Sequence, residues 1–214
     1  MQNTSSASIE TLIFDLAKVL MPPGLLYLEN TIGEYTNIST QDFRDRRREI
    51  DDYFLATMRG TYTEHDYLQL LLHGTDWGLS PANLITIIRR NFDRDFEDNA
   101  IQIVQDLKDT GQYRLVLFSD HVREWIEYIW QTRSELLEMF DERLFSFDFN
   151  GVKSDPGTFR EALNKLDVKA AHCIFIDDRP VNIEAAQIAG INTITYTGSS
   201  ALRQQLANEY GIHV

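Results

Sequence analysis

The sequence predicts an α/β fold, with a parallel β-sheet in a Rossmann-like core and an inserted helical segment. The main observation is a set of short apolar runs that each stop abruptly at a polar residue. There are four of these runs: residues 12–14 before Asp15, 115–118 before Ser119, 174–176 before Asp177, and 192–196 before Thr197. Continuous runs of this length suit strands buried on both faces, although periodicity alone leaves buried helices open.

Segments with helical periodicity separate the later runs. An apolar stripe over residues 100–107 is followed by Gly111, which suits a helix C-terminus. Asp155 followed by Pro156 predicts a helix start, and Pro180 predicts another that ends near Gly190. Alternating strands and helices indicate a parallel sheet with right-handed crossovers.

A long segment, residues 20–113, contains no convincing strand. Ser39, Thr63 and Ser80 each begin a helix-capping pattern within it. The basic run at residues 44–48 is flanked by acidic residues, so we expect a solvated helix face with local ion pairs. We therefore predict an α/β core over residues 1–20 and 96–214, and a helical cap over residues 21–95 inserted after the first strand.

Charge and composition restrict the function classes. Of 214 residues, 33 are acidic and 20 are basic, giving a formal net charge of −13, which disfavours nucleic acid and acidic membranes as partners. The lone cysteine, Cys173, cannot form an internal disulfide and is expected in the core. Residues 1–8 do not resemble a signal peptide, and no apolar stretch approaches the roughly 20 residues of a membrane helix. We expect a soluble cytoplasmic protein, either a monomer or a homodimer.

The polar residues at the strand ends are expected to face one crevice, because parallel strands present their carboxyl ends at one edge of the sheet. Asp15, Ser119 and the pair Asp177-Asp178 follow apolar runs, and Lys153 precedes a predicted helix. Clustered carboxylates repel one another unless a cation neutralises them, and oxygen ligands suit Mg²⁺. The lysine and serine would bind an anion. Phosphate fits best, with one carboxylate free to attack it.

Each of these residues taken alone also has an ordinary structural interpretation. An aspartate or serine after a strand is commonly a turn or helix-cap residue, and Lys153 alone would be a surface lysine. The adjacent Asp177 and Asp178 are more specific, because a cap needs only one carboxylate. The combination in this order favours a functional site.

Together these residues resemble the four motifs of the haloacid dehalogenase superfamily. The resemblance runs from about Thr11 to Gly211 and rests on residues 15–20, Ser119, residues 153–156 and residues 175–179. It implies that Asp15 is a nucleophile that forms an aspartyl intermediate.

The resemblance also assigns roles in binding. Ser119 and Lys153 would bind the phosphoryl group, with Asp120 beside them. The residues implied in binding Mg²⁺ are Asp15, Asp178 and the backbone carbonyl of Ala17, with Asp177 assisting.

Ala17 departs from the superfamily pattern, in which phosphatases usually carry a second aspartate two residues after the nucleophile. That aspartate acts as general acid and base. A small residue at this position resembles the subgroup typified by α-D-glucose-1-phosphate phosphatases, whose anomeric leaving group needs less protonation. Asp120 or His121 could instead supply a proton, while an exposed His121 in a first helical turn is an equally open interpretation. His65 could contact substrate, although a lone histidine more often has no such role.

Three functions follow from these observations. The first is a Mg²⁺-dependent phosphatase of a small phosphorylated metabolite, with a sugar phosphate as the favoured example. The second is a 2-haloacid dehalogenase, in which halide leaves without a proton but the Asp177-Asp178 pair has no metal to bind. The third is a non-catalytic or weakly active binding protein that keeps the fold and is impaired by Ala17.

Overall fold

A five-stranded parallel sheet forms the centre of the protein, in the strand order β3-β2-β1-β4-β5. The computed structural model describes residues 8–214, so the N-terminal stretch discussed above lies outside it except for Ser8. The strands are β1 (Thr11–Phe14), β2 (Arg114–Ser119), β3 (Glu142–Phe145), β4 (Cys173–Asp177) and β5 (Asn192–Thr195). This arrangement confirms the predicted α/β fold class.

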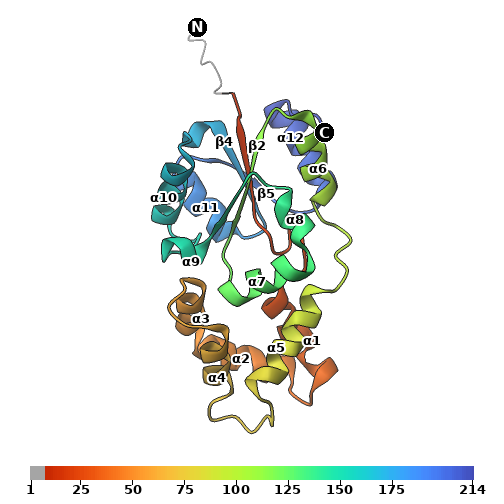
Figure 1. The fold of residues 1–214 in the computed structure, drawn as a ribbon, viewed down its shortest axis with the longest axis vertical. Helices are drawn as coiled ribbons and strands as arrows, with labels where there is room; N and C mark the ends of the chain where they lie inside the picture. The colour runs from red at the N-terminus through yellow and green to blue at the C-terminus, as the bar shows by residue number, and fades with distance from the viewer. Residues whose placement is uncertain (1–7) are drawn as a thin grey trace.

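Helices cover both faces of the sheet (Figure 1). Leu12 and Phe14 of β1 pack into one apolar cluster with α6 (Ile101–Thr110) and α12 (Ser199–Tyr210). The intervening Ile13 packs into a second cluster with residues of α10 and α11. Successive side chains of a strand point to opposite faces, so a continuous apolar run is needed where both faces are buried.

The other helices of the α/β part connect or follow the strands. They are α7 (Arg123–Thr132), α8 (Ser134–Glu138), α9 (Ser146–Phe149), α10 (Pro156–Leu166), α11 (Pro180–Ile188) and the 3₁₀ turn Ala170–His172. Two predicted helix ends are confirmed in detail. The Asp155 carboxylate accepts the Gly157 N–H (2.8 Å) at the start of α10, and Gly111 ends α6 with φ of 62°, a left-handed conformation that glycine adopts readily.

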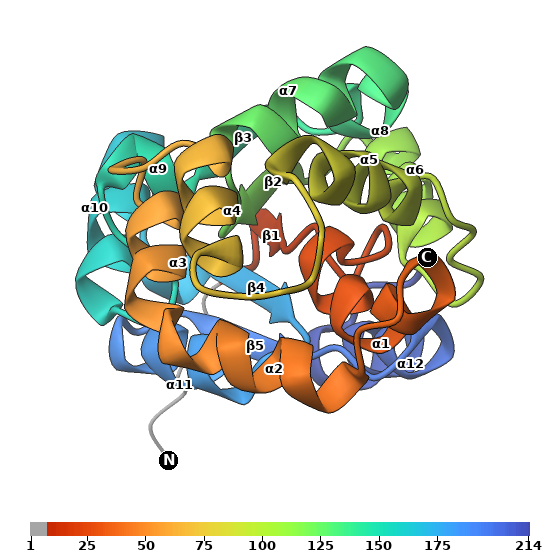
Figure 2. The same ribbon diagram turned by 90° about the horizontal axis from the view of Figure 1, so that it is seen from below.

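Six helices lie between β1 and β2 in the sequence: α6, which packs on the sheet, and five helices that precede it. The five are α1 (Gly24–Tyr35), α2 (Thr40–Glu49), α3 (Asp51–Met58), α4 (Glu64–Leu72) and α5 (Pro81–Phe92). The predicted caps are present: Ser39 accepts an N–H at the start of α2, and capping boxes begin α4 and α5. Figures 1 and 2 show these helices gathered beyond one end of the sheet.

The parallel register decides which residues meet at that end. Phe14 pairs with Leu117 of β2 and with Ile176 of β4. Asp15, the residue that directly follows β1, therefore lies beside the ends of both neighbouring strands. The helices α1 to α5 lie over this same edge of the sheet (Figure 2).

Strand β3 was missed by the sequence analysis. It is an edge strand that pairs only with β2, and its first two residues, Glu142 and Arg143, are partly exposed. Such a strand needs no continuous apolar run, because one of its sides has no neighbour. Glu142 accepts hydrogen bonds from Arg114 of β2 (2.8 and 2.5 Å), which is a charged rather than an apolar pairing.

Only part of the basic run on α2 forms the solvated face that the sequence predicts. Arg48 is exposed and contacts Asp45 on its own helix, but Arg47 is buried and forms an ion pair with Glu29 of α1. The expectation was therefore wrong for Arg47.

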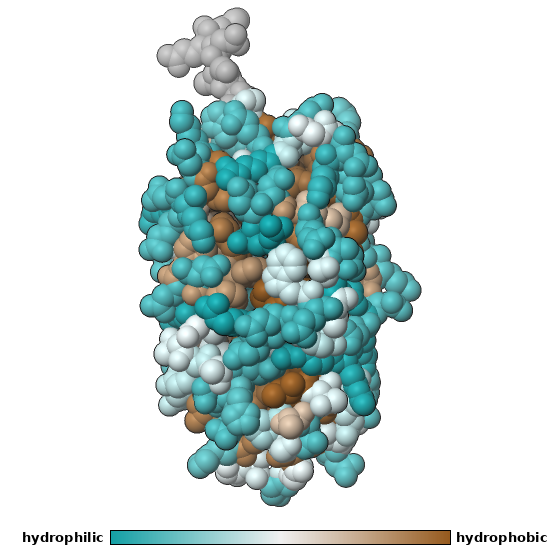
Figure 3. Space-filling model, in the orientation of Figure 1, coloured by the Kyte–Doolittle hydropathy of each residue, from teal (hydrophilic) through white to brown (hydrophobic). Residues whose placement is uncertain are grey.

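The molecular surface is mainly hydrophilic on the face drawn in Figure 3, with small apolar patches between the charged regions. Cys173 is buried in β4, as predicted. Within residues 8–214, the helices are too short or too polar to cross a lipid bilayer.

Two glycines of α1 offer a matched test of packing between α1 and α5. A Cβ atom at Gly24 would lie 2.4 Å from the Phe92 ring, whereas one at Gly33 would meet only a backbone oxygen at 3.6 Å. We expect Gly24→Ala to lower the free energy of unfolding by about 1–3 kcal/mol. Gly33→Ala should raise it by roughly 0.5–1 kcal/mol, because alanine favours the helix. Denaturant unfolding of both variants measures this, and equal effects would contradict it.

Candidate functional site

A buried lysine joins two strand ends. Lys153, in the loop before α10, is 1% exposed, and its ammonium donates to Asp15 (2.6 Å) and to Asp177 (2.6 Å). Asp15 follows β1 and Asp177 ends β4, so this lysine bridges adjacent strands. A buried ammonium is tolerated only with such charged partners.

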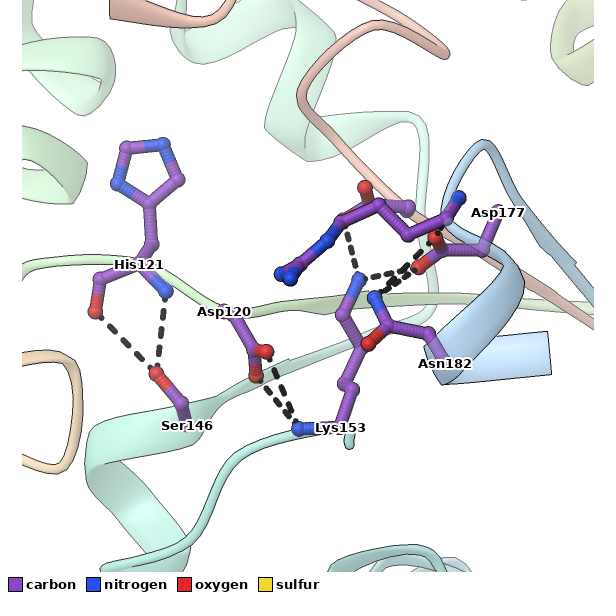
Figure 4. A network of polar contacts seen from close by, with 8 residues as sticks. Asp120, His121, Ser146, Lys153, Asp177 and Asn182 are labelled. Atoms are coloured by element: carbon purple, nitrogen blue, oxygen red, sulfur yellow. Dashed lines mark hydrogen bonds and ion pairs between the residues drawn. The ribbon is translucent and has the colours of Figure 1, made fainter. Parts of the chain in front are cut away.

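Asp177 is held by contacts on both carboxylate oxygens (Figure 4). Besides Lys153, it accepts the backbone N–H of Arg179 (2.8 Å) and the side-chain amide of Asn182 (3.2 and 3.0 Å). Asp177 is fully buried, and these donors fix its position. Its clearest structural effect is to orient Lys153.

Three carboxylates lie close enough to share a cation. Asp15, Asp177 and Asp178 each offer an oxygen, and these atoms lie within 4.8 Å of one another. The Lys18 ammonium lies 3.2 Å from Asp178, and Lys18 adopts a left-handed backbone conformation, with φ of 63°. An oxygen-only donor set of this kind fits Mg²⁺.

The protonation balance of this cluster is set by burial. Burial raises the pKa of Asp15 above its ordinary value, while the Lys153 charge opposes that shift. Burial alone would lower the pKa of Lys153, but its carboxylate neighbours raise it, so the lysine stays charged. A bound cation would favour the ionised form of the carboxylates.

A cavity of about 230 Å³ lies between the sheet and the inserted helices. Among the predicted site residues, it is lined by Asp15, Ala17, Asp120, Lys153 and Asp178. Two others do not line it. Ser119 is 1% exposed with a hydroxyl that has no hydrogen-bond partner among the described residues, and Asp177 lies behind Lys153.

Asp120 binds the loop before α10 that carries Lys153. Both of its carboxylate oxygens accept the Lys153 backbone N–H (2.9 and 3.1 Å), as Figure 4 shows. Burial raises the pKa of Asp120, and Lys153 opposes the shift. These contacts give Asp120 a positioning role in the structure, in addition to its place at the cavity.

His121 also lines the cavity, and it is buried rather than exposed. Its ring packs against Phe92 of α5 and Trp125 of α7, with centroids 5.7 and 5.5 Å away. Its backbone N–H donates to the Ser146 hydroxyl (3.0 Å). The interpretation of His121 as an exposed residue in a first helical turn is therefore wrong.

Among the residues at the cavity that the sequence analysis did not assign to the site are Asn182 and Arg47, and one residue that it named lies elsewhere. Asn182 is fully buried in the first turn of α11 and binds Asp177; its spacing after the acidic pair could have indicated this. Arg47 lines the cavity from α2. His65 is exposed on α4 and does not line this cavity.

Comparison with known proteins decides the family. Residues 9–190 match the haloacid dehalogenase-like hydrolases. The chain belongs to this family. It therefore has the α/β core of the hydrolases of this family.

One characterised relative is similar over a short segment. A flavin mononucleotide hydrolase of Arabidopsis thaliana chloroplasts is 36% identical over 62 residues. This segment is 29% of the present chain and spans a quarter of that relative's length (25%).

Solved structures of the family share the fold over most of the chain. A haloacid dehalogenase family enzyme of Bacteroides thetaiotaomicron is 20% identical, with a TM-score of 0.71 over 89% of this chain and 95% of its own. The structure of its complex with magnesium and inorganic phosphate, also 20% identical, has a TM-score of 0.70 and covers 89% of this chain and 96% of its own. A dehalogenase that is 19% identical has a TM-score of 0.65 and covers 89% of this chain and 85% of its own. At these identities the likeness shows a shared fold.

The buried histidine predicts acid sensitivity of the fold. Burial lowers the pKa of His121 from 6.5 to about 3, so the native protein holds this ring neutral, while the unfolded chain binds a proton below about pH 6.5. Stability should therefore be lost as pH falls. From pH 7 to pH 5, His121 alone should lower the free energy of unfolding by about 2 kcal/mol. In His121→Gln this part of the loss should disappear. Urea unfolding of both proteins at the two pH values measures it, and parallel losses would contradict the assignment.

Proposed function

We propose that the protein is a Mg²⁺-dependent phosphatase of a small phosphorylated metabolite, with a sugar phosphate as the favoured substrate class. The observation that carries this proposal is the carboxylate of Asp15 at the cavity, 2.6 Å from the buried ammonium of Lys153 and clustered with Asp178. A nucleophile beside a fixed positive charge suits attack on an anionic phosphoryl group.

Asp15, Asp178 and the backbone carbonyl of Ala17 would hold the metal, since all three residues line the cavity. Bound Mg²⁺ would neutralise charge on the phosphoryl oxygens. Asp177 would assist mainly by holding Lys153, because its oxygens already accept from three donors.

The reaction proceeds in two steps under this proposal. An Asp15 oxygen attacks phosphorus, the bond from phosphorus to the ester oxygen breaks, and the leaving alkoxide takes a proton. Water then attacks the phosphorus of the aspartyl phosphate, releasing inorganic phosphate and restoring Asp15. Lys153 and Ser119 would bind phosphoryl oxygens. Ser119 would need its buried hydroxyl to turn toward the cavity, and that hydroxyl is free of other partners among the described residues.

The inserted helices, predicted as a cap over residues 21–95, would exclude water from the site and select the substrate. In support, their residues Pro23, Gly24, Leu25, Met58 and others line the same cavity as Asp15. The Ser146 hydroxyl also donates to the Met58 carbonyl (2.6 Å), a buried contact between the two parts.

The residue at position 17 bears on which leaving groups the site accepts. Ala17 lies at the cavity without a proton to give, which favours esters with a good leaving group, as in the glucose-1-phosphate phosphatase-like subgroup. Flavin mononucleotide belongs in any substrate screen, because a relative is named as its hydrolase.

A 2-haloacid dehalogenase is the second candidate, and Ala17 favours it because halide departs without a proton. The cluster of three carboxylates counts against it, since dehalogenation requires no metal. A non-catalytic binding protein is the third candidate; the intact pairing of Asp15 with Lys153 counts against it.

Replacement of Asp15 tests the nucleophile. With Mg²⁺ present, the native enzyme should release phosphate from aryl or sugar phosphates, and Asp15→Asn should abolish this, because the amide cannot attack phosphorus. Phosphate release over a Mg²⁺ titration is the measurement. Turnover of 2-chloropropionate without metal would favour the dehalogenase instead.

The control is Asp155→Asn, which changes a helix cap outside the cavity and should retain activity. Substantial turnover by purified Asp15→Asn would remove Asp15 from the nucleophile role. Absence of turnover by the native protein on every ester would favour the binding protein.

Ala17→Asp tests the missing general acid. The native enzyme should hydrolyse aryl and anomeric phosphates much faster than glycerol phosphate. The variant should accelerate glycerol phosphate hydrolysis by up to roughly 10²–10⁴-fold. Lys18 could hold the new carboxylate ionised and reduce the gain, although its ammonium already contacts Asp178. The measurement is a leaving-group series on both proteins. A flat series in the native enzyme would mean that another group, such as Asp120 or His121, donates the proton.

A further inference from the structure

Arg47 is a buried cation that the proposed phosphatase chemistry does not use. It lies on α2, is 8% exposed, and lines the cavity that also contains Asp15 and Lys153. Burying a guanidinium is costly unless its donors are satisfied. The position of Arg47 in the inserted helices and the burial of its side chain therefore require an explanation.

Only part of the guanidinium is satisfied by protein groups. Nη1 donates to the Glu29 carboxylate, and the face of the guanidinium lies over the Phe54 ring, 5.2 Å from its centroid. Nε is buried and has no hydrogen-bond partner among the described residues, and no hydrogen bond from Nη2 is found within residues 8–214. The Tyr67 hydroxyl also lies beside the guanidinium, and Nε has no surface open to the cavity. Nη2 is therefore the group of Arg47 left to donate to a ligand in the cavity.

The cavity that Arg47 lines has both polar and aromatic side chains in its wall. Asp51, an exposed residue at the start of α3, lines the cavity and supplies a hydrogen-bond acceptor. Phe54 and Trp125 line it too, with ring centroids 6.1 Å apart. A guanidinium donor, a carboxylate acceptor and aromatic rings together suit a ligand with several hydroxyl groups on an apolar ring.

The charges near Arg47 favour a neutral ligand over a second anion. Glu29 pairs with Arg47 and also lies 3.6 Å from Arg44, and Asp51 at the cavity brings the sum of these four charges to zero. A carboxylate or second phosphate on the leaving group would meet Asp51 without a net positive charge beside it, whereas a hydroxyl can donate to Asp51 and accept from Arg47.

We propose that Arg47 and Asp51 are specificity residues that bind neighbouring hydroxyl groups of a neutral sugar as the leaving group of the substrate. This inference rests on the proposed phosphatase function and narrows its substrate class. It separates neutral sugar phosphates from phosphorylated sugar acids of the same size, which carry a carboxylate.

The test compares Arg47→Lys and Asp51→Asn with the native enzyme on three esters: glucose 1-phosphate, 6-phosphogluconate and phenyl phosphate, with Mg²⁺ present. Arg47→Lys keeps the charge beside Glu29 but loses the planar guanidinium and its Nη2 donor. Both variants should lower kcat/KM for glucose 1-phosphate relative to phenyl phosphate by about tenfold or more, mainly through KM. Asp51→Asn should also improve the relative use of 6-phosphogluconate. Asp51 is exposed, so this variant tests the proposal even where Arg47→Lys does not fold.

Arg44→Lys is the matched control. Arg44 lies on the same helix and near the same Glu29 carboxylate, but it does not line the cavity. It should leave the ratio of glucose 1-phosphate to phenyl phosphate unchanged. An equal loss in Arg44→Lys and Arg47→Lys would overturn the proposal, as would a native preference for 6-phosphogluconate.

Calorimetric binding separates failure of this inference from failure of the phosphatase function. If the native protein hydrolyses none of the esters, glucose 1-phosphate should still bind more tightly than inorganic phosphate, and that difference should vanish in Arg47→Lys. Turnover of phenyl phosphate with an unchanged ratio in both variants would retain the phosphatase and reject the role of Arg47 and Asp51. Equal binding of glucose 1-phosphate and inorganic phosphate by the native protein would also reject it.

Discussion

The ion pairs of Lys153 with Asp15 and Asp177 are the interaction on which the rest of the site depends. Burying an unpaired ammonium at 1% exposure would cost several kcal/mol of folding free energy. The loop before α10 can therefore bury Lys153 only where its ammonium pairs with two carboxylates. Those carboxylates are brought together by the pairing of β1 with β4. The backbone hydrogen bonds of the sheet thus determine where the charged groups meet.

A second set of contacts makes this arrangement rigid. Asp120 holds the backbone of Lys153, while Asn182 and the Arg179 N–H hold Asp177. The lysine is therefore fixed at both its backbone and its ammonium. A charge fixed in this way need not reorganise when an anion binds, which is the property that electrostatic catalysis requires. It also means that removing Asp120 would affect Lys153 as well as any proton transfer.

Much of the fold could be predicted because the responsible signals are local. The buried strands of the sheet centre need continuous apolar runs, and helix ends need caps at fixed offsets, as at Ser80 and Asp155. Strand β3 was not predicted, because its pairing with β2 is a tertiary contact and an edge strand can carry charged residues such as Glu142 and Arg143. The family resemblance predicted a role for each site residue, whereas the positions of the charged residues alone predicted only that they lie at one site.

Burial of polar side chains was the part least predictable from the sequence. Arg47 lies within a run of arginines that looks solvated, and the partner that buries it, Glu29, comes from another helix. His121 was open to an exposed interpretation, yet α5 and α7 enclose it with Phe92 and Trp125. The contacts of Arg47 with Glu29 and of His121 with Phe92 join segments distant in sequence, which no helical or strand periodicity records.

The same distant contacts hold the inserted helices against the sheet. Glu64 of α4 is buried, accepts the indole N–H of Trp125 from α7, and binds Arg89 of α5 (2.9 and 2.6 Å). Ser146 adds the contact to Met58. Separating α7 from the inserted helices would remove the Trp125 donor from this buried carboxylate, so the contact between the two parts keeps Glu64 satisfied. The packing of the two parts also brings Arg47 and Lys153 to one cavity from different parts of the chain. Because neither part contains both cations, recognition of the two ends of a substrate would require both parts in contact.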